Sequence, residues 1–373
     1  MQREQLEASR EALGPRHQST LTSMCNLADS LKSLGRYAEA EALQREELEA
    51  SREVLGPRHR ETLTSMCNLA GLLRSLGRYA EAEALQREEL EASREVLGPR
   101  HRETLTSMGN LADSLRSLGR YAEAEAMHRE QLEASREVCG PRHPETLASM
   151  GNVASLRKSL GRYAEAEAMQ REQLEASREV LGSRHPNTLL AMGNLASSLS
   201  DLGRSAEAEA MHREVLEARR EGLGPRHPNT LLAMSHTGLL LTKLGRWDEA
   251  VALLRSALEE QRAILGASHV STLTAASRLA EAHCRNGALR SAREVLDGSD
   301  EGGEVGQGGV VAAVVKIVGA QHKLSLEVRA RAALLQASEG DEEGHRLLKC
   351  RVEDMRRVLG DAHATTRWWA ASL

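Results

Sequence analysis

Five asparagines recur in this sequence, each 42 residues after the one before, and their amide side chains could bind a polypeptide main chain. An amide donates hydrogen bonds through its nitrogen and accepts them through its oxygen, so it can pair with both the carbonyl and the N–H of an extended peptide. A row of such groups would hold a main chain with little regard to its side chains. The row consists of Asn26, Asn68, Asn110, Asn152 and Asn194.

A basic residue stands six positions after each of the first four asparagines. These residues could pair with acidic side chains or with a terminal carboxylate. The two rows together predict a binding surface for an extended, acidic peptide segment. In an alternative interpretation the amides join neighbouring helices and the cations only keep helix ends in water. The basic residues are Lys32, Arg74, Arg116 and Lys158.

Histidines recur with the same period, from His17 to His269, and they raise the question of a metal site. One ligand in each of several separate loops cannot assemble a tetrahedral ligand shell, so we expect the histidines to cap helices or lie in loops, and we expect no metal. The cysteines are odd in number and form no CxxC pair, which indicates reduced thiols without a disulfide framework. They are Cys25, Cys67, Cys139, Cys284 and Cys350.

No constellation of catalytic type is present. The sequence has no Ser/His/Asp arrangement, no glycine loop of the phosphate-binding kind and no HExxH motif. Carboxylates are frequent, but they alternate with arginines on a helix face that should be wet, where acid–base catalysis is not expected. We therefore expect that the protein is not an enzyme, binds no cofactor and has no small-molecule substrate.

Composition narrows the classes of partner. The 54 acidic and 49 basic residues nearly balance and are interspersed, so the basic stripe needed for nucleic acid is missing. No run approaches the length of a membrane span, and the N-terminus has no apolar signal core, so no membrane contact and a cytoplasmic location are expected. With 2% aromatic residues and no Phe, the core must consist of Leu, Ala, Met and Val in closely packed helices.

The whole sequence is organised by a repeat of 42 residues. A GPRH-like mark begins at a glycine in each repeat, and a second mark, GR, follows 21 residues later, so each repeat has two halves that glycine ends. Each half is long enough for one helix, called here helix A and helix B, over about residues 18–34 and 37–55 in the first full repeat. The first mark begins at Gly14, Gly56, Gly98, Gly140, Gly182, Gly224 and Gly266.

The repeat phase also predicts the organisation of the chain. Residues 1–16 form a partial repeat with helix B only, 17–297 a tandem array, 298–312 a glycine-rich acidic insertion, and 313–373 a degenerate repeat with the start of another. Marks resume at Gly319 and Gly360, with Gly340 in phase between them. Both ends look cut from a longer array or imperfectly capped, and such apolar ends could pair with other copies.

The string NLADSLKSLGRYAEAEAL, from Asn26 to Leu43, resembles the tetratricopeptide repeat, and the 42-residue period with LGPRHPxTL resembles its kinesin light chain subclass. The resemblance implies an all-α fold, a right-handed α-solenoid of helix-turn-helix repeats. It also implies that the helix A faces line a concave groove, where an asparagine at the matching position binds a peptide backbone. The matching positions include Leu27, Ala28, Leu31, Gly35, Tyr37, Ala40 and Leu48.

The sequence departs from the family pattern at several places. Polar pairs stand in helix B where the family has an aromatic residue and an alanine, namely Gln44 with Glu47, Gln86 with Glu89, and His128 with Gln131, and we expect looser packing there. Leu254 and Ala257 keep the apolar and small residue types, and we expect good packing there. Leu156 and Arg157 interrupt the pattern of their helix A and suggest a local shift. The heptad segment by which kinesin light chains bind their motor is absent.

These observations favour a scaffold for protein–protein interactions that binds a protein or peptide segment in the groove. One alternative is a sensor or regulatory array detached from a larger signalling ATPase of the NB-ARC kind, since such arrays commonly follow a switch domain. A third interpretation is a duplication product without a specific partner.

Overall fold

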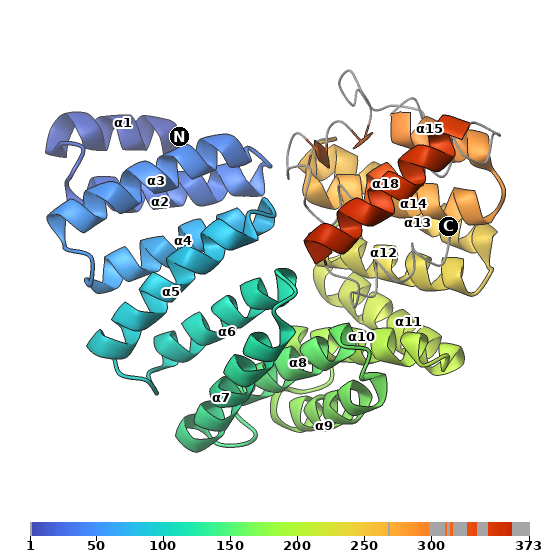
Figure 1. Ribbon diagram of the computed structural model, residues 1–373, viewed down its shortest axis with the longest axis horizontal. Helices are drawn as coiled ribbons and strands as arrows, with labels where there is room; N and C mark the ends of the chain where they lie inside the picture. The colour runs from blue at the N-terminus through green and yellow to red at the C-terminus, as the bar shows by residue number, and fades with distance from the viewer. Residues whose placement is uncertain are drawn as a thin grey trace. The chain divides into compact units, whose positions relative to one another are not determined.

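The computed structural model of this chain describes residues 2–267, 269–297, 310–311, 314–315, 327–333 and 342–359. The predicted insertion at 298–312 lies outside these residues except at 310 and 311, and so do the expected marks at Gly319, Gly340 and Gly360. Within the described part all regular structure is helical, and the helices follow one another as consecutive pairs (Figure 1). The predicted all-α solenoid is therefore confirmed.

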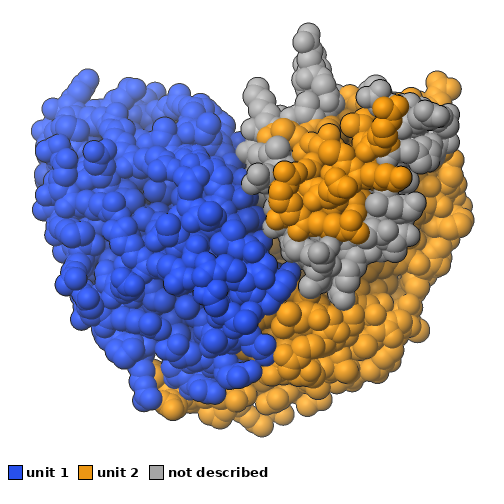
Figure 2. All heavy atoms as spheres, in the orientation of Figure 1, with its two compact units in different colours: residues 1–134 blue, residues 135–373 orange. Residues whose placement is uncertain are grey.

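The helices form two compact units, residues 1–134 and 135–373, and the division falls within α7 (Figure 2). Unit 1 contains α1 (Gln2–Leu13), α2 (Gln18–Ser33), α3 (Tyr37–Val54), α4 (Arg60–Ser75), α5 (Tyr79–Val96), α6 (Arg102–Ser117) and most of α7 (Tyr121–Cys139). Unit 2 contains the end of α7, α8 (Pro144–Ser159), α9 (Tyr163–Leu181), α10 (Pro186–Asp201), α11 (Ser205–Leu223), α12 (Pro228–Lys243), α13 (Trp247–Leu265), α14 (Val270–Arg285), α15 (Leu289–Asp297) and α18 (Glu342–Leu359). The even-numbered helices from α2 to α14 are helix A of their repeats.

A histidine caps the N-terminus of each helix A. Its Nδ1 accepts a hydrogen bond from the backbone N–H two residues later, over 3.1 to 3.3 Å. This bond satisfies one of the backbone donors that a helix start leaves without an internal partner. The expected capping role is confirmed for His17, His59, His101, His143, His185, His227 and His269.

Glycine is required by the backbone at both marks of the repeat. At the second mark, Gly35 has φ of 73°, and the next residue closes the turn through the N–H of Arg36 and the carbonyl of Leu31 at 2.8 Å. At the first mark, Gly182 has φ of 90° and ψ of 157°, a region open essentially to glycine alone. This conformation differs from the left-handed helical one in which glycine often ends a helix, and it makes glycine a stricter requirement.

The core of each unit consists of leucine, methionine and alanine stripes that face the neighbouring helices. Alanines lie where helices approach most closely, and Ala28, Ala40, Ala70 and Ala82 have no exposed surface. Small side chains permit this approach, because a protein interior has the packing density of an organic crystal. In unit 2, residues 327–333 are helical, and Val328 joins the apolar cluster around Leu279 on α14.

The polar residues that were expected to loosen the packing are buried instead. Glu89 is 2% exposed, and its Oε1 accepts hydrogen bonds from the hydroxyls of Ser93 and Ser107, both at 2.7 Å. Gln86 accepts one from Ser114 at 2.6 Å. Other atoms of the same set, Gln44 Oε1 and Glu89 Oε2 among them, are buried without a hydrogen-bond partner among the described residues. The burial of these side chains does not support the looser packing that the sequence predicts there.

Two further departures from the repeat have different outcomes. The expected shift near Leu156 does not occur, because α8 begins and ends 42 residues after α6 and Leu156 is fully buried. The good packing expected around Leu254 is confirmed. That side chain has no exposed surface and lies over Gly238, where an added Cβ would be 2.5 Å from the leucine Cγ.

In unit 1, a residue of helix A and the residue of helix B that it contacts change together from one repeat to the next. In the second repeat the Cys67 thiol is hydrogen-bonded to Glu89, whereas the third repeat has Gly109 facing Gln131. A Cβ at Gly109 would be 2.7 Å from the Gln131 Nε2. The glutamine therefore needs the space that glycine leaves, and the cysteine needs the glutamate.

This pairing predicts a coupling between two substitutions. Glu89→Gln alone should crowd Cys67, while adding Cys67→Gly converts the pair to that of the next repeat. We expect the double variant to be more stable than the sum of the single effects by about 1–2 kcal/mol, as is common for contacting residues. Urea unfolding of the full chain and the three variants measures this, and additive effects would contradict it.

Candidate peptide-binding surface

The asparagine row lies at one register of helix A throughout the array. Asn26, Asn68 and Asn110 lie in unit 1 on α2, α4 and α6, and Asn152 and Asn194 lie in unit 2 on α8 and α10. Asn26 is exposed and the other four are half-buried. None of the five side-chain amides has a hydrogen-bond partner among the residues that the structure describes. They join no neighbouring helices, so their donors and acceptors are available to an external group.

The charged residues of helix B are in a different state, because they pair with one another. Arg45 contacts Glu41 at 2.9 Å within α3, and Arg78 reaches the same carboxylate from the next repeat at 2.6 Å. Arg52 likewise contacts Glu88 of the following helix B at 2.8 Å. Exposed pairs of this kind each stabilise a protein by less than about 1 kcal/mol. Many of the helix B charges therefore already have partners within the array.

In unit 1, two residues of the basic row share one carboxylate. Arg74 lies 3.2 Å from Asp113, and Arg116 lies 3.5 Å from the other oxygen of the same carboxylate. The third member of the row in this unit, Lys32, has no ion pair among the described residues. One negative charge for two guanidinium groups leaves a net positive charge at this point.

In unit 2, two cations again share one carboxylate, but the residues are different. Lys158 contacts Asp201 at 3.0 Å, and Lys243, which the sequence argument did not single out, contacts it at 3.2 Å. Burial by itself would raise the pKa of Asp201, but the two ammonium groups outweigh that effect and the pKa is lowered. Asp201 is therefore a carboxylate held between two cations.

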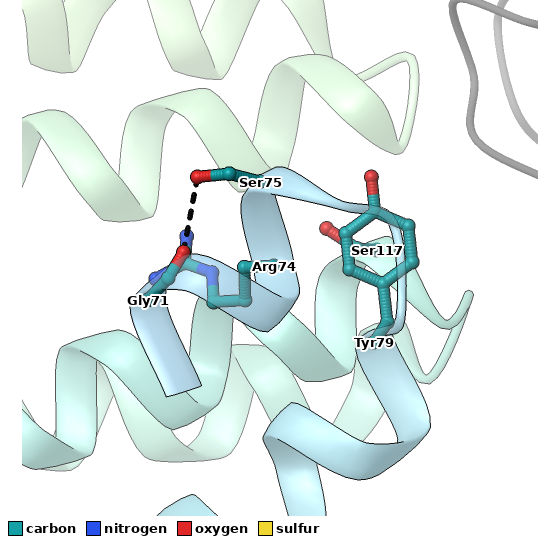
Figure 3. A pocket seen from close by; sticks show the side chains of 5 residues that line it. All are labelled: Gly71, Arg74, Ser75, Tyr79 and Ser117. Carbon is teal, nitrogen blue, oxygen red and sulfur yellow. Dashed lines mark hydrogen bonds between the residues drawn. The ribbon is translucent and has the colours of Figure 1, made fainter. Parts of the chain in front are cut away.

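A pocket of about 380 Å³ opens in unit 1 beside Arg74. Its other lining residues are Gly71, Ser75, Tyr79 and Ser117, and Figure 3 shows the Ser75 hydroxyl joined to the Gly71 carbonyl and the ring of Tyr79 beside Ser117. Gly71 stands where the adjacent repeats carry Asp29 and Asp113. A Cβ there would have no atom within 4 Å, so the missing carboxylate contributes to the open space.

The electrostatics of this pocket suit an anion. Burial raises the pKa of the Tyr79 hydroxyl, although Arg116 and Arg74 act in the opposite direction. The phenol therefore stays neutral and able to donate a hydrogen bond. A carboxylate could pair with the Arg74 guanidinium there, and the nearby charge of Arg116 would add to the attraction.

Sequence reasoning missed Gly71, Tyr79, Asp113 and Asp201 as members of this surface. The available signal was departure from the repeat, since Gly71 interrupts a position held by aspartate on both sides and Asp201 replaces serine. The same alignment places His236 and Arg278 at the next two positions of the asparagine row, so the chemistry of the row changes after Asn194.

The thiols beside the asparagines carry no chemistry of their own. Burial raises the pKa of Cys25 to about 12, and nearby Glu47 acts in the same direction. The pKa of Cys67 is also about 12, for the same reason and with Glu89 as its neighbour. Both thiols are free and stay protonated at neutral pH.

A model of the tetratricopeptide repeat matches the chain at residues 1–53, 26–92, 61–130, 110–172, 151–221, 192–259 and 229–297. The chain belongs to the tetratricopeptide repeat family. Arrays of these repeats are generally non-catalytic scaffolds, and the helix pairs of this chain fit a scaffold for protein interactions.

Solved structures show the same fold. The apo form of the quorum sensor NprR from B. thuringiensis is 15% identical, with a TM-score of 0.59, and the match covers 95% of this chain and 92% of that one. A Rap protein complexed with Competence and Sporulation Factor is 12% identical, with a TM-score of 0.53, covering 90% and 98%. The nearly identical TPR-like repeats of a Podosopora anserina protein described as a kinesin light chain are 25% identical, with a TM-score of 0.46, covering 58% and 97%. No curated protein matches the chain.

None of the described helices combines the length and the apolar character that crossing a membrane requires.

His212 is a buried titratable group next to the Lys158–Asp201–Lys243 cluster. It is 6% exposed and contacts the ring of His236 edge to face, with the ring centroids 6.4 Å apart. Burial, and then the charges of Lys158 and Lys243, lower its pKa to about 4. The equivalent residue one repeat earlier is the buried Gln170.

This pKa predicts how stability depends on pH. The folded-state pKa of His212 is below its unfolded value. Between about pH 6.5 and 4 the unfolded chain therefore takes up a proton that the folded chain does not, and the stability of the folded chain decreases as the pH is lowered. His212→Gln should have little effect at pH 7 and should make the protein more stable than wild type by about 2–3 kcal/mol at pH 4.5. Urea unfolding at the two pH values measures this, and an equal difference at both would contradict it.

Proposed function

We propose that this tetratricopeptide array is a protein-interaction scaffold that binds an extended peptide segment along the helix A surface. The observation that carries the proposal is the row of five side-chain amides that have no hydrogen-bond partner among the described residues, on a protein in which many helix B charges pair with one another. An amide that is left half-buried and unbonded has lost part of its hydration, so a peptide group that satisfies it gains more than it would in open water.

The pocket beside Arg74 supports an acidic side chain or terminal carboxylate in the bound segment. Arg74 and Arg116 share Asp113, so the local charge is positive, and the neutral Tyr79 side chain lines the same pocket. A Rap protein of the same fold is recorded in complex with Competence and Sporulation Factor, which agrees with a binding role for such arrays.

Asparagine substitutions test the main-chain part of the proposal. Peptides selected from a random display library on the intact chain would be compared for binding to the wild type and to the double variant Asn68→Ala/Asn110→Ala. At about 0.5–1.5 kcal/mol for each lost hydrogen bond, binding should weaken roughly ten- to hundredfold. The measurement is a fluorescence-anisotropy titration, with circular dichroism to confirm the helices.

A matched control separates this effect from loss of any surface amide. Asn187 and Asn229 are exposed residues in the first turns of α10 and α12, outside the row. Asn187→Ala/Asn229→Ala should leave the affinity unchanged. Equal binding by the wild type and the Asn68/Asn110 variant would overturn the proposal.

The pocket is tested by two substitutions at one glycine. Gly71→Asp restores the residue of the neighbouring repeats and places a carboxylate near Arg74, while Gly71→Ser fills similar space without charge, as Ser155 and Ser197 do at the same position. Acidic peptides should bind about three- to tenfold more weakly to the Asp variant than to the Ser variant, as expected for a partly exposed ion pair. The readout is the same anisotropy titration, with neutral peptides as the control. If acidic peptides bind both variants equally, the pocket is not their site.

A further inference from the structure

One turn between repeats differs from all the others in a single residue with metal-binding chemistry. Cys139 is the last residue of α7 and comes just before the Gly140 mark. Every other described helix B that reaches this mark has leucine there, namely Leu13, Leu55, Leu97, Leu181, Leu223 and Leu265. The exchange introduces a thiol immediately before a loop that already contains histidine and glutamate.

The thiol is close to two further groups of the same turn. Cys139, His143 and Glu145 each offer a ligand atom, and these three atoms lie within 4.8 Å of one another. The Cys139 Sγ and the Glu145 Oε2 are 3.7 Å apart. Tetrahedral zinc with bonds of about 2.3 Å to sulfur and 2.0–2.2 Å to oxygen places these two atoms about 3.5–3.7 Å apart, so this pair needs little movement.

The turn that carries the three residues is held in place on both sides. The Thr146 hydroxyl donates to the carbonyls of Gly140 at 2.7 Å and of Ser135 at 3.1 Å, which ties the first turn of α8 to the end of α7. The Gly140 N–H is bonded to the Arg136 carbonyl at 3.0 Å. Fixed backbone at the ligands reduces the ordering that a metal would require.

We propose that Cys139, His143 and Glu145 form a three-ligand site for a borderline transition metal ion such as Zn²⁺, with solvent at the fourth position. Thiolate and imidazole select zinc-like ions over Mg²⁺ and Ca²⁺, which require oxygen ligands in larger number. The site lies entirely within unit 2 and joins the end of a helix B to the start of the next helix A. It is separate from the asparagine row and does not depend on the proposed function.

A metal ion would compete with a hydrogen bond that His143 already makes. The His143 Nδ1 accepts the N–H of Glu145 at 3.2 Å, and a neutral imidazole has one lone pair for either purpose. Coordination through Nδ1 replaces this bond, and coordination through Nε2 puts a proton on Nδ1 facing the amide. The metal also displaces the thiol proton. We therefore expect a site that weakens as pH falls.

Cobalt is the probe for the test, because thiolate ligation gives Co²⁺ a charge-transfer absorption in the near ultraviolet and tetrahedral geometry gives strong visible bands. The full chain, reduced, would be titrated with Co²⁺ and then with Zn²⁺ in competition with a chromophoric chelator. We expect a single ion per chain, with the cobalt bands displaced by zinc. Zinc should also raise the thermal unfolding midpoint.

The repeats supply matched variants. Cys139→Leu recreates the sequence of the neighbouring turns, keeps the other four cysteines and all the histidines, and should abolish the thiolate band and the thermal shift. His143→Asn keeps a good helix cap and removes the imidazole, so affinity should fall by more than about tenfold, since even outer ligands contribute that much. His101→Asn makes the same change in a turn with Leu97 in place of the thiol and should leave metal affinity unchanged.

The outcomes divide clearly. No thiolate band in the wild type, a band of equal strength in Cys139→Leu, or equal losses in His143→Asn and His101→Asn would each overturn the proposal. Circular dichroism of every variant ensures that a lost band does not reflect a lost fold. A band that only the Cys139 and His143 substitutions remove would establish the site.

Discussion

The described helices bury their apolar stripes mainly against the helices next to them in the chain, and the rest of the structure depends on that constraint. Alanines without exposed surface, such as Ala28 and Ala40, let the helix axes approach, and leucines and methionines fill the layer between them. Positive-φ glycines such as Gly35 reverse the chain at fixed intervals, so every repeat presents the same register to the next. A side chain at one position therefore recurs as a row along each unit.

That regularity separates the two kinds of helix surface. On helix B, arginines and glutamates of successive repeats reach each other, as Arg52 and Glu88 do, and the charges neutralise one another. On helix A, the five asparagine side chains of the row have no partner among the residues that the structure describes, and in each unit two cations share one carboxylate, Asp113 or Asp201. The unbonded asparagine amides and the residual positive charge thus lie on helix A, which is the basis for the binding proposed there.

Nearly identical repeats also make each departure informative, because the neighbouring repeat is a control within the same molecule. Gly71 leaves a pocket where adjacent repeats have aspartate, and Cys139 adds a thiol where they have leucine. Gly109 faces Gln131 where the preceding repeat pairs Cys67 with Glu89. In each case one or two residues change the local chemistry while the backbone stays in register, so the effect can be assigned to those residues.

Much of the fold could be predicted from the sequence, because local rules determine it. Glycine spacing, the capping histidine and the apolar period specify two helices per repeat, and α2 ends within one residue of the expected bound. The rows of Asn68 and Arg74 also follow from the period alone. Tertiary structure decided what lies across the stack: that buried Glu89 accepts a hydrogen bond from Ser107, that Arg74 is paired with Asp113, and that Cys139 lies close to Glu145. These contacts join different helices, and a single-chain period contains no information on the distances between them.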